Sequence, residues 1–280
     1  MTARLIGDVG ATGSDWILVL DATMKTFTLG GYNPLSQSVE RMDSLLNGLR
    51  NEVGRTPVNI HFYGAGVGIG SHLEMMEKRF KESLSVRTIE FASDLLGAAW
   101  VLCGTEVGVV CILGIGSNVC YYDGHRLQSG HSLGYLIGDE GSGMDIGRRL
   151  IRAYYYELLP ARLKQYFSTF LPKDRLDFLR KFKDQTAPNQ FLAQFTEYVL
   201  SVKDQLFIQE MLSEAFTDFI IFHLYHIKRK SKINVVGSIA FYFCGEFEKC
   251  LSKHDLQLGK VLRKPIDALA AFHNSPNNKL

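Results

Sequence analysis

Residues 111–124 read CILGIGSNVCYYDG and residues 138–143 read GDEGSG, and this part of the chain decides the expected fold. The uncharged, β-branched run at 107–113 predicts a strand that ends in a glycine-rich loop at 114–118. A second strand is expected at 119–122, and Asp123-Gly124 predicts the tight turn of a hairpin. Glycines let the backbone approach a ligand closely, and Ser117 and Asn118 add hydrogen-bonding groups at the loop tip. Such a loop suits an oxyanion or a sugar hydroxyl.

The N-terminus repeats this arrangement. Residues 5–14 read LIGDVGATGS, a short strand that opens into a loop of glycines, hydroxyls and one carboxylate. Further strands are expected at 16–20 and 27–29, so the first loop also lies between two strands. Two such units, one opening each half of the chain, predict a duplicated fold with a ligand held between the halves.

Three motifs carry a resemblance to a known group of proteins. They are the Asp-x-Gly-x-Thr start (Asp8, Gly10, Thr12), the Gly-x-Gly-Ser-Asn loop at 114–118 and the Gly-Asp-Glu-Gly-Ser-Gly segment at 138–143. Together they resemble the N-acetylglucosamine kinases and the BadF/BadG/BcrA/BcrD ATPases, a group within the actin-like sugar kinase and Hsp70 superfamily. The resemblance covers nearly the whole chain, and Gly-Asp-Glu-Gly-Ser is its most specific element.

The resemblance implies an α/β fold of two actin-like, ribonuclease H-like lobes. Each lobe would be a mixed five-stranded sheet flanked by helices, with a cleft between the lobes. We expect residues 1–104 to form the N-terminal lobe and residues 105–280 the C-terminal lobe. Pro265 is expected to start the last helix, which in relatives can pack back across the junction onto the N-terminal lobe.

Apolar spacing predicts the helices. Residues 39–53 show the helical repeat, and residues 144–230 are expected to be helical with breaks at the prolines 160, 172 and 188. Within that region a core-facing stripe repeats every four residues: Phe207, Met211, Ala215 and Phe219. His223 and His226 have no Cys or carboxylate partner at metal-binding spacing, so we expect a structural role for them.

The resemblance also implies ATP and Mg²⁺ as cofactors. Asp8 would attract Mg²⁺ through water, while peptide N–H groups and hydroxyls of the glycine loops would hold phosphate oxygens. A strand is expected at 232–236, followed by Gly237-Ser238-Ile239-Ala240 and a helix to about Leu251. This strand–glycine–helix turn resembles the superfamily's adenosine loop. No Walker loop is present, because Gly-x-x-x-x-Gly-Lys does not occur. The expected nucleotide-binding residues are Asp8, Gly10, Thr12, Gly13, Ser14, Gly114, Gly116, Gly237 and Ser238.

The expected reaction is phosphoryl transfer from MgATP to a hydroxyl of an amino sugar, with N-acetylglucosamine the first candidate. Asp94 follows the expected strand at 87–91 in an Asp-x-x-x-Ala context found in sugar kinases, which implies the catalytic base. Helix capping is the commonest role of residues such as Ser93 and Asp94, and is compatible with catalysis. Asn33 is followed by proline, so an ordinary turn is an equal alternative for it. The expected sugar-binding residues are Asn33, Gly66 (in the glycine-rich run 64–70), Ser117, Asn118, Asp139 and Gly143.

Composition limits the other possibilities. A chain of 280 residues with 46% hydrophobic residues can bury a sizeable core, and a formal net charge of +2 gives no reason to expect nucleic acid or an anionic membrane. The five cysteines are odd in number and form no C-x-x-C pair, which favours reduced thiols of a cytoplasmic protein. No signal peptide or membrane helix is expected. The sequence leaves the oligomeric state undecided, with a homodimer as one candidate.

Two other functions remain open at this point. One is an ATPase that activates a partner enzyme, as in the activators of acyl-CoA dehydratases, although Cys103, Cys111 and Cys120 are not convincingly spaced for a shared iron–sulfur cluster. The other is a non-catalytic sugar sensor. Intact Asp8 and Asp94, and the absence of an N-terminal DNA-binding extension, weigh against a sensor.

Overall fold

The computed structural model describes residues 3–21, 23–68, 72–130, 132–227 and 231–274. The chain divides into two compact units. Unit 1 contains the described residues up to Thr105 together with those from Lys264 onward, and unit 2 contains residues 106–263. Each unit is built on its own five-stranded sheet. Among the described residues, no helix has both the length and the apolar character that crossing a membrane requires.

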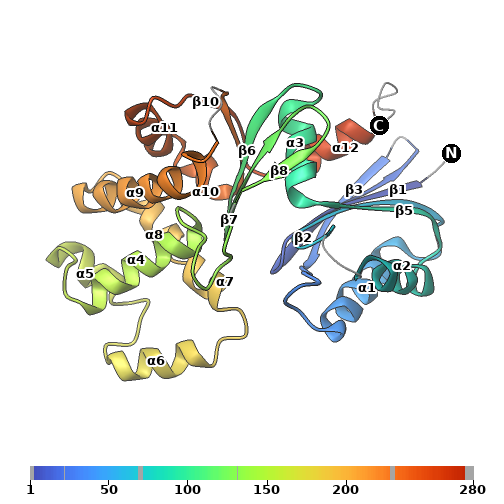
Figure 1. Ribbon diagram of the computed structural model, residues 1–280. Coiled ribbons are helices and arrows are strands. Elements are labelled where there is room, and N and C mark those ends of the chain that lie inside the picture. Colours follow the sequence, from blue (N-terminus) through green and yellow to red (C-terminus); the bar gives the residue numbers. More distant parts are fainter. Residues whose placement is uncertain (1–2, 22, 69–71, 131, 228–230, 275–280) are drawn as a thin grey trace. The chain divides into compact units, whose positions relative to one another are not determined.

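Unit 1 has the strand order β3-β2-β1-β4-β5 (Figure 1). The first three strands form an antiparallel meander, and β4 and β5 extend the sheet in parallel with β1. Its elements are β1 (Ala3–Val9), β2 (Gly13–Leu20), β3 (Thr23–Gly30), α1 (Val39–Val53), β4 (Val58–Gly64), α2 (His72–Ser83), β5 (Val86–Ser93), α3 (Asp94–Cys103) and α12 (Ile266–Asn274). The sheet is therefore mixed, as the resemblance implied.

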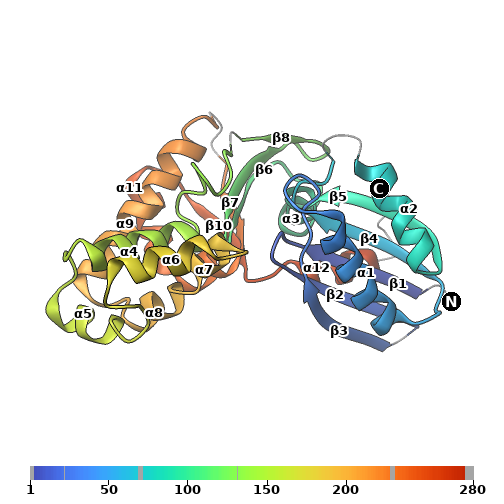
Figure 2. The ribbon, with the colours of Figure 1, turned by 90° about the horizontal axis from the view of Figure 1, so that it is seen from below.

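The two faces of this sheet follow from the alternation of side chains along β1. Leu5 and Val9 belong to the core beneath α1 and α2, whereas Ile6 belongs to a second core on the other face. That second core contains Ile266 and Leu269 of α12 and is bordered by α3. Both views show α1 and α2 on one side of the strands and α3 and α12 on the other (Figures 1 and 2). Asp8 shares the strand parity of Ile6 and so lies on the face of α3 and α12.

Unit 2 has the strand order β10-β9-β6-β7-β8. Strands β6, β7 and β8 are antiparallel neighbours, while β9 and β10 add in parallel with β6. Its strands are β6 (Gly108–Leu113), β7 (Ser117–Tyr122), β8 (Leu127–Ser129), β9 (Ile233–Val236) and β10 (Leu258–Leu262). This order repeats the β3-β2-β1-β4-β5 pattern of unit 1, so the predicted duplication and the predicted pair of mixed five-stranded sheets are confirmed.

The helices of unit 2 gather on one face of its sheet (Figure 2). They share one large apolar core with the sheet residues Val109, Cys111, Leu113, Val119 and Tyr121. The helices are α4 (Gly143–Tyr155), α5 (Ala161–Phe167), α6 (Arg175–Lys183), α7 (Pro188–Ala193), α8 (Thr196–Ser201), α9 (Leu206–Phe219), the π-helical turn η1 (Ile220–Leu224), α10 (Ser238–Tyr242) and α11 (Cys244–Lys253).

The core-facing stripe predicted on α9 is present: Met211, Ala215 and Phe219 are buried, and Phe207 is partly buried and packs against the same core. Ile208 beside it is fully buried, because at 3.6 residues per turn a strict four-residue repeat drifts across the buried face. One detail of the predicted helices needs correction. The helix expected up to about Leu251 is two helices, since the chain breaks at Phe243, whose ring is buried.

Candidate functional site

Asp8 and Asp94 come together in unit 1 because of the sheet topology. Strands β1 and β5 lie on either side of β4 and run parallel to it, so their carboxyl ends meet at one edge. Asp8 pairs with Tyr63 near the end of β1, and Asp94 begins α3 directly after β5. Ligands of open α/β sheets bind outside this edge. Both carboxylates keep partial access to solvent there.

The pair is under-neutralised by the protein. Burial raises the pKa of Asp8 to about 7, with further increases from the charges of Asp94 and Asp15, and Lys264 lowers it only in part. The Lys264 ammonium is held by Asp15, with Nζ 2.7 Å from Oδ1. No described residue donates a hydrogen bond to the Asp8 carboxylate. Such a carboxylate gains most from an added cation.

Asp94 is held at one oxygen and open at the other. Its Oδ1 accepts the N–H of Leu95 at 2.8 Å, and apart from its own backbone N–H no other described residue donates to this carboxylate. The cap of α3 is made by Ser93, whose hydroxyl accepts the N–H of Leu96 at 3.2 Å. Burial raises the pKa of Asp94, and the N–H of Leu95 counteracts this in part. Of the two expected capping candidates, Ser93 therefore caps and leaves Asp94 with a free oxygen.

The donor chemistry of this pair fits Mg²⁺, which takes oxygen ligands, uses one or two carboxylates and keeps several waters and substrate oxygens. Within the described ranges, no three His, Cys, Asp or Glu side chains gather as a ready-made metal cluster. A protein-only cage is thus absent from that part of the chain, while the arrangement of Asp8 and Asp94 suits a cation that arrives with a nucleotide.

The loop after β1 is fixed by its own backbone. The N–H of Gly10 donates to the carbonyl of Gly13 at 3.0 Å, and the N–H of Gly31 donates to that of Thr12 at 3.1 Å. Gly31 is required here, because a Cβ on it would lie 2.1 Å from the carbonyl oxygen of Gly10. The Thr12 hydroxyl has no hydrogen bond to any described residue. The loop is thus held by backbone hydrogen bonds that do not use the Thr12 hydroxyl.

Ser14 is different from Thr12. Its hydroxyl is buried, donates to the carbonyl of Gly30 at 2.9 Å and accepts from Nε1 of Trp16 at 2.8 Å. The structure therefore gives the Ser14 side chain a role in joining β2 to β3. The sequence pattern could not show this, because the requirement comes from the buried indole of Trp16.

Asn33 and Gly66, both expected near the sugar, are neighbours. Gly66 has φ +75°, and a Cβ on it would lie 2.3 Å from Oδ1 of Asn33. That Oδ1 also accepts the N–H of Leu35 at 2.9 Å, so the Asn33 side chain closes a turn, as the alternative interpretation held. Its amide NH₂ has no partner among the described residues and is open to a ligand. Residues 69–70 of the glycine-rich run lie outside the described residues.

In unit 2 the loop at 114–118 and the turn at 138–143 are bonded to each other. The N–H of Gly143 donates to the carbonyl of Gly114 at 2.8 Å, and that of Met144 donates to Ile115 at 3.1 Å. A Cβ on Gly116 would lie 2.6 Å from Oδ2 of Asp139. Glycine at 116 therefore allows the carboxylate of Asp139 to lie against the backbone of the loop.

Asp139 has an unusual backbone and an unusual pKa. Its φ is +60°, in the left-handed region that few residues other than glycine adopt. Burial raises its pKa to about 6, while the N–H of Ser117 lowers it and the charge of Glu140 raises it. The hydroxyl of Ser117 is buried without a partner among the described residues, and Asn118 uses Oδ1 for the N–H of Val119. These polar groups converge on one small region.

Gly237 joins this region from β9. Its φ is +134°, and a Cβ on it would lie 2.1 Å from the carbonyl oxygen of Leu113. The turn after β9 thus lies beside the end of β6 and next to Gly114. Ser238 follows as the exposed first residue of α10. The structure therefore brings Gly114, Gly116, Gly237 and Ser238 to the same edge of the unit 2 sheet.

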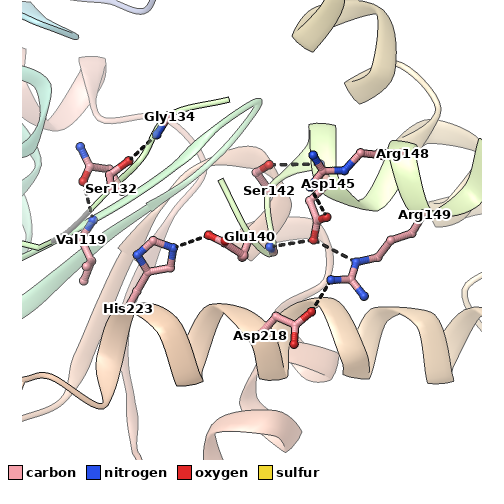
Figure 3. A network of polar contacts seen from close by, with 12 residues as sticks. Val119, Ser132, Gly134, Glu140, Ser142, Asp145, Arg148, Arg149, Asp218 and His223 are labelled. Carbon is pink, nitrogen blue, oxygen red and sulfur yellow. Dashed lines mark hydrogen bonds and ion pairs between the residues drawn. The ribbon is translucent and has the colours of Figure 1, made fainter. Parts of the chain in front are cut away.

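Sequence reasoning missed the network that holds the turn (Figure 3). Asp145 is buried, and its carboxylate accepts the N–H of Gly141 at 3.1 Å, Nη2 of Arg148 at 2.9 Å and Nε of Arg149 at 3.0 Å. Asp145 lies three and four residues before the two arginines, a spacing that predicts ion pairs on one face of a helix. The pairing of Glu140 with His223, at 2.9 Å, joins residues that are far apart in the sequence, so no local pattern predicts it.

Known proteins resemble this chain in part of its sequence and in its fold. No family model matches the chain. A segment of 76 residues, 26% of this chain, is 42% identical to a curated N-acetylmuramic acid/N-acetylglucosamine kinase from Clostridium acetobutylicum and spans 23% of that protein. The match thus covers about a quarter of the length of this curated relative.

Solved structures match over nearly the full length. A provisionally assigned N-acetylglucosamine kinase from Porphyromonas gingivalis aligns with a TM-score of 0.85 and 29% identity, covering 99% of this chain and 100% of the other. A ROK family glucokinase from Streptomyces griseus, solved with glucose and AMPPNP, aligns with a TM-score of 0.55 and 12% identity over 96% and 98% of the two chains. The second likeness concerns the fold alone. The chain therefore has the two-unit fold of actin-like sugar kinases, and its predicted resemblance to the N-acetylglucosamine kinases is confirmed.

Proposed function

We propose that the protein is an ATP-dependent kinase that phosphorylates a hydroxyl of an amino sugar, with N-acetylglucosamine the first candidate. The observation that carries the proposal is the pair of carboxylates, Asp8 and Asp94, at the carboxyl edge of the unit 1 sheet. One of them is suited to a cation and the other has a free oxygen. The kinase names of the relatives support the same chemistry.

In this mechanism the sugar hydroxyl attacks the γ-phosphorus, the bond from that phosphorus to the β–γ bridging oxygen breaks, and ADP leaves. Oδ2 of Asp94 accepts the hydroxyl proton as the new bond forms. Burial raises the pKa of Asp94, which makes its carboxylate a stronger base than an exposed one. The N–H of Leu95 holds the other oxygen, so the side chain stays in one orientation.

Asp8 would hold Mg²⁺ through water, and the metal would neutralise the phosphate charges. The backbone of residues 10–13 and the Thr12 hydroxyl lie next to Asp8 in sequence and would contact phosphate oxygens. The side chain of Ser14 is engaged by Gly30 and Trp16, so its contribution would come from the backbone. Gly114, Gly116, Gly237 and Ser238 would contact the nucleotide from unit 2.

The sugar would be bound by groups without full hydrogen bonding in the protein. These are the amide NH₂ of Asn33, the hydroxyl of Ser117, the side chain of Asn118 and the carboxylate of Asp139, with Gly66 and Gly143 as backbone surfaces. We also propose a cytoplasmic protein, because an odd number of cysteines without a C-x-x-C pair favours reduced thiols.

The test measures ADP formation with MgATP and a panel of amino sugars and glucose. We expect an amino sugar to accelerate turnover, and Asp94→Asn to lower kcat by about 10²- to 10⁴-fold while both substrates still bind. Asp21→Asn, which changes an exposed carboxyl of the same unit, is the control and should act like wild type. Steady ATP hydrolysis that no sugar accelerates, or full activity in Asp94→Asn, would contradict the proposal.

A further inference from the structure

The turn at 138–143 lies against α9 and is joined to η1 by the contact of Glu140 with His223. Gly141 has φ +70°, and a Cβ on it would lie 2.8 Å from Cβ of Phe219 and 3.2 Å from the carbonyl oxygen of Ala215. His223 continues this four-residue spacing into η1, whose wider π turn is bonded from the N–H of Tyr225 to the carbonyl of Ile220. Single π turns are rare and often found at functional sites.

His223 reaches the turn through Glu140 (Figure 3). Nε2 of His223 lies 2.9 Å from Oε2 of Glu140, and the imidazole is 3% exposed whereas the Glu140 side chain is 21% exposed. An ionised carboxylate only accepts hydrogen bonds, so Nε2 carries the proton and donates it. Nδ1, the other ring nitrogen, is buried without a partner among the described residues.

This orphaned nitrogen argues against a packing role alone. A buried polar atom without a hydrogen bond destabilises a protein, and an apolar side chain such as leucine would fill the same space without that penalty. The contact of His223 with Glu140 gives a reason to keep the histidine at this cost. Glu140 directly follows Asp139, whose backbone is in the left-handed region. Holding Glu140 from one side limits the rotation of the backbone that aims Asp139 toward Gly116 and Ser117.

We propose that His223 is a positioning residue for sugar binding. By holding Glu140 it keeps Asp139 in its φ +60° conformation, and it thereby sets the affinity for the sugar rather than the rate of phosphoryl transfer. This inference rests on the proposed function, since it assigns His223 to the same sugar site without a contact to the sugar.

The test compares His223→Leu with His223→Gln, whose amide N–H can replace the Nε2 donor. We expect His223→Leu to raise the KM for the amino sugar about 10- to 100-fold, with kcat and the KM for ATP changed less than about threefold, and His223→Gln to recover most of the sugar affinity. His226→Leu, at an exposed histidine on the same segment, is the control. If Leu and Gln behave alike, or if kcat falls as much as the sugar affinity, the inference is wrong.

A second readout does not need activity and separates this inference from the proposed function. Amide hydrogen exchange of residues 138–143 should be faster in His223→Leu than in wild type, with no change in the strands of unit 1, and His223→Gln should restore protection. In addition, Glu140→Gln combined with His223→Leu should add little to the single effect, because both remove one contact. Unchanged exchange in His223→Leu would overturn the inference even if the protein phosphorylates a sugar.

Discussion

At the scale of single residues, the candidate site consists of acids that the fold itself leaves poorly neutralised. Asp8 has a pKa raised to about 7 and Asp139 one raised to about 6, each mainly by burial. Burying a carboxyl without a cationic partner opposes folding, and such perturbed groups gather at functional sites. The same acids that would bind ligands therefore make the ligand-free protein less stable than it could be.

Asp8→Asn should consequently stabilise the ligand-free protein at alkaline pH. A carboxyl whose pKa is raised on folding contributes stability below its unfolded value, near 4, and loses that contribution as pH rises through about 7. Asparagine does not ionise, so the variant should melt at a higher temperature than wild type at pH 8. Calorimetry at pH 4 is the internal control, where the difference should shrink. A variant less stable than wild type at pH 8 would contradict this account.

Gly116 should be the least replaceable glycine of the loop at 114–118. A Cβ there would lie 2.6 Å from Oδ2 of Asp139, so Gly116→Ala should displace that carboxylate. We expect the sugar KM to rise about 10-fold or more, since a bound hydroxyl would lose a charged acceptor worth about 1.5–3 kcal/mol. Gly245→Ala, where a Cβ meets nothing within 4 Å, is the matched control. Equal sugar KM values in wild type and Gly116→Ala would show that Asp139 does not contact the sugar.

At the scale of elements, the sequence was most informative where one local pattern decides the structure. The helix predicted at 39–53 has those bounds as α1, and β6 and β7 flank the predicted glycine loop. The break at Phe243 was not predicted, because it depends on burying that ring in the unit 2 core. The Ser14–Trp16 and Glu140–His223 contacts likewise depend on tertiary packing, which residue spacing does not encode.

Helix α12 shows how an element can depend on pH through one contact. The ring of His273 stacks on that of His61 at 3.8 Å between centroids, and its Nε2 lies 2.5 Å from the Tyr63 hydroxyl. Burial lowers the pKa of His273 to about 4, with smaller contributions from His61 and Arg4. The neutral imidazole is therefore the form that packs between α12 and the strand residues His61 and Tyr63.

Unit 1 should therefore lose stability in mild acid. A histidine whose pKa falls on folding contributes stability above its unfolded value, near 6.5, and that contribution is lost as pH falls through about 4. His273→Gln cannot titrate, so its stability should depend less on pH between about 6.5 and 4. Urea unfolding at several pH values measures this, with His125→Gln at an exposed histidine as the control. Parallel pH profiles for wild type and His273→Gln would contradict the assignment.

At the scale of the whole molecule, unit 1 is made from both ends of the chain while unit 2 is one continuous segment. Residues 264–274 return to unit 1, where Lys264 bonds to Asp15 and α12 packs on β1, β2 and α3. The resemblance predicted two units, each built on a mixed five-stranded sheet. It could not supply the contacts that hold α12, because these depend on the particular side chains of this chain.

A chain that ends at Arg263 should lose the native structure of unit 1 and keep that of unit 2. Ile266 and Leu269 are almost fully buried, and each such side chain contributes about 1.5–3 kcal/mol, against a total stability of about 5–15 kcal/mol. Both tryptophans of the sequence, Trp16 and Trp100, belong to unit 1, and Trp100 stacks on Phe272 of α12 at 5.4 Å. Tryptophan fluorescence therefore reports on this unit alone.

In the truncated chain we expect red-shifted tryptophan emission and rapid amide exchange in β1–β5, with slow exchange retained in β6, β7 and β9. A synthetic peptide of residues 264–280 should restore the native emission when added, because it supplies the missing side of the core around Ile6 and Tyr63. The same peptide with Ile266 and Leu269 changed to serine is the control and should restore nothing. Native emission in the truncated chain without any peptide would show that unit 1 is complete without α12.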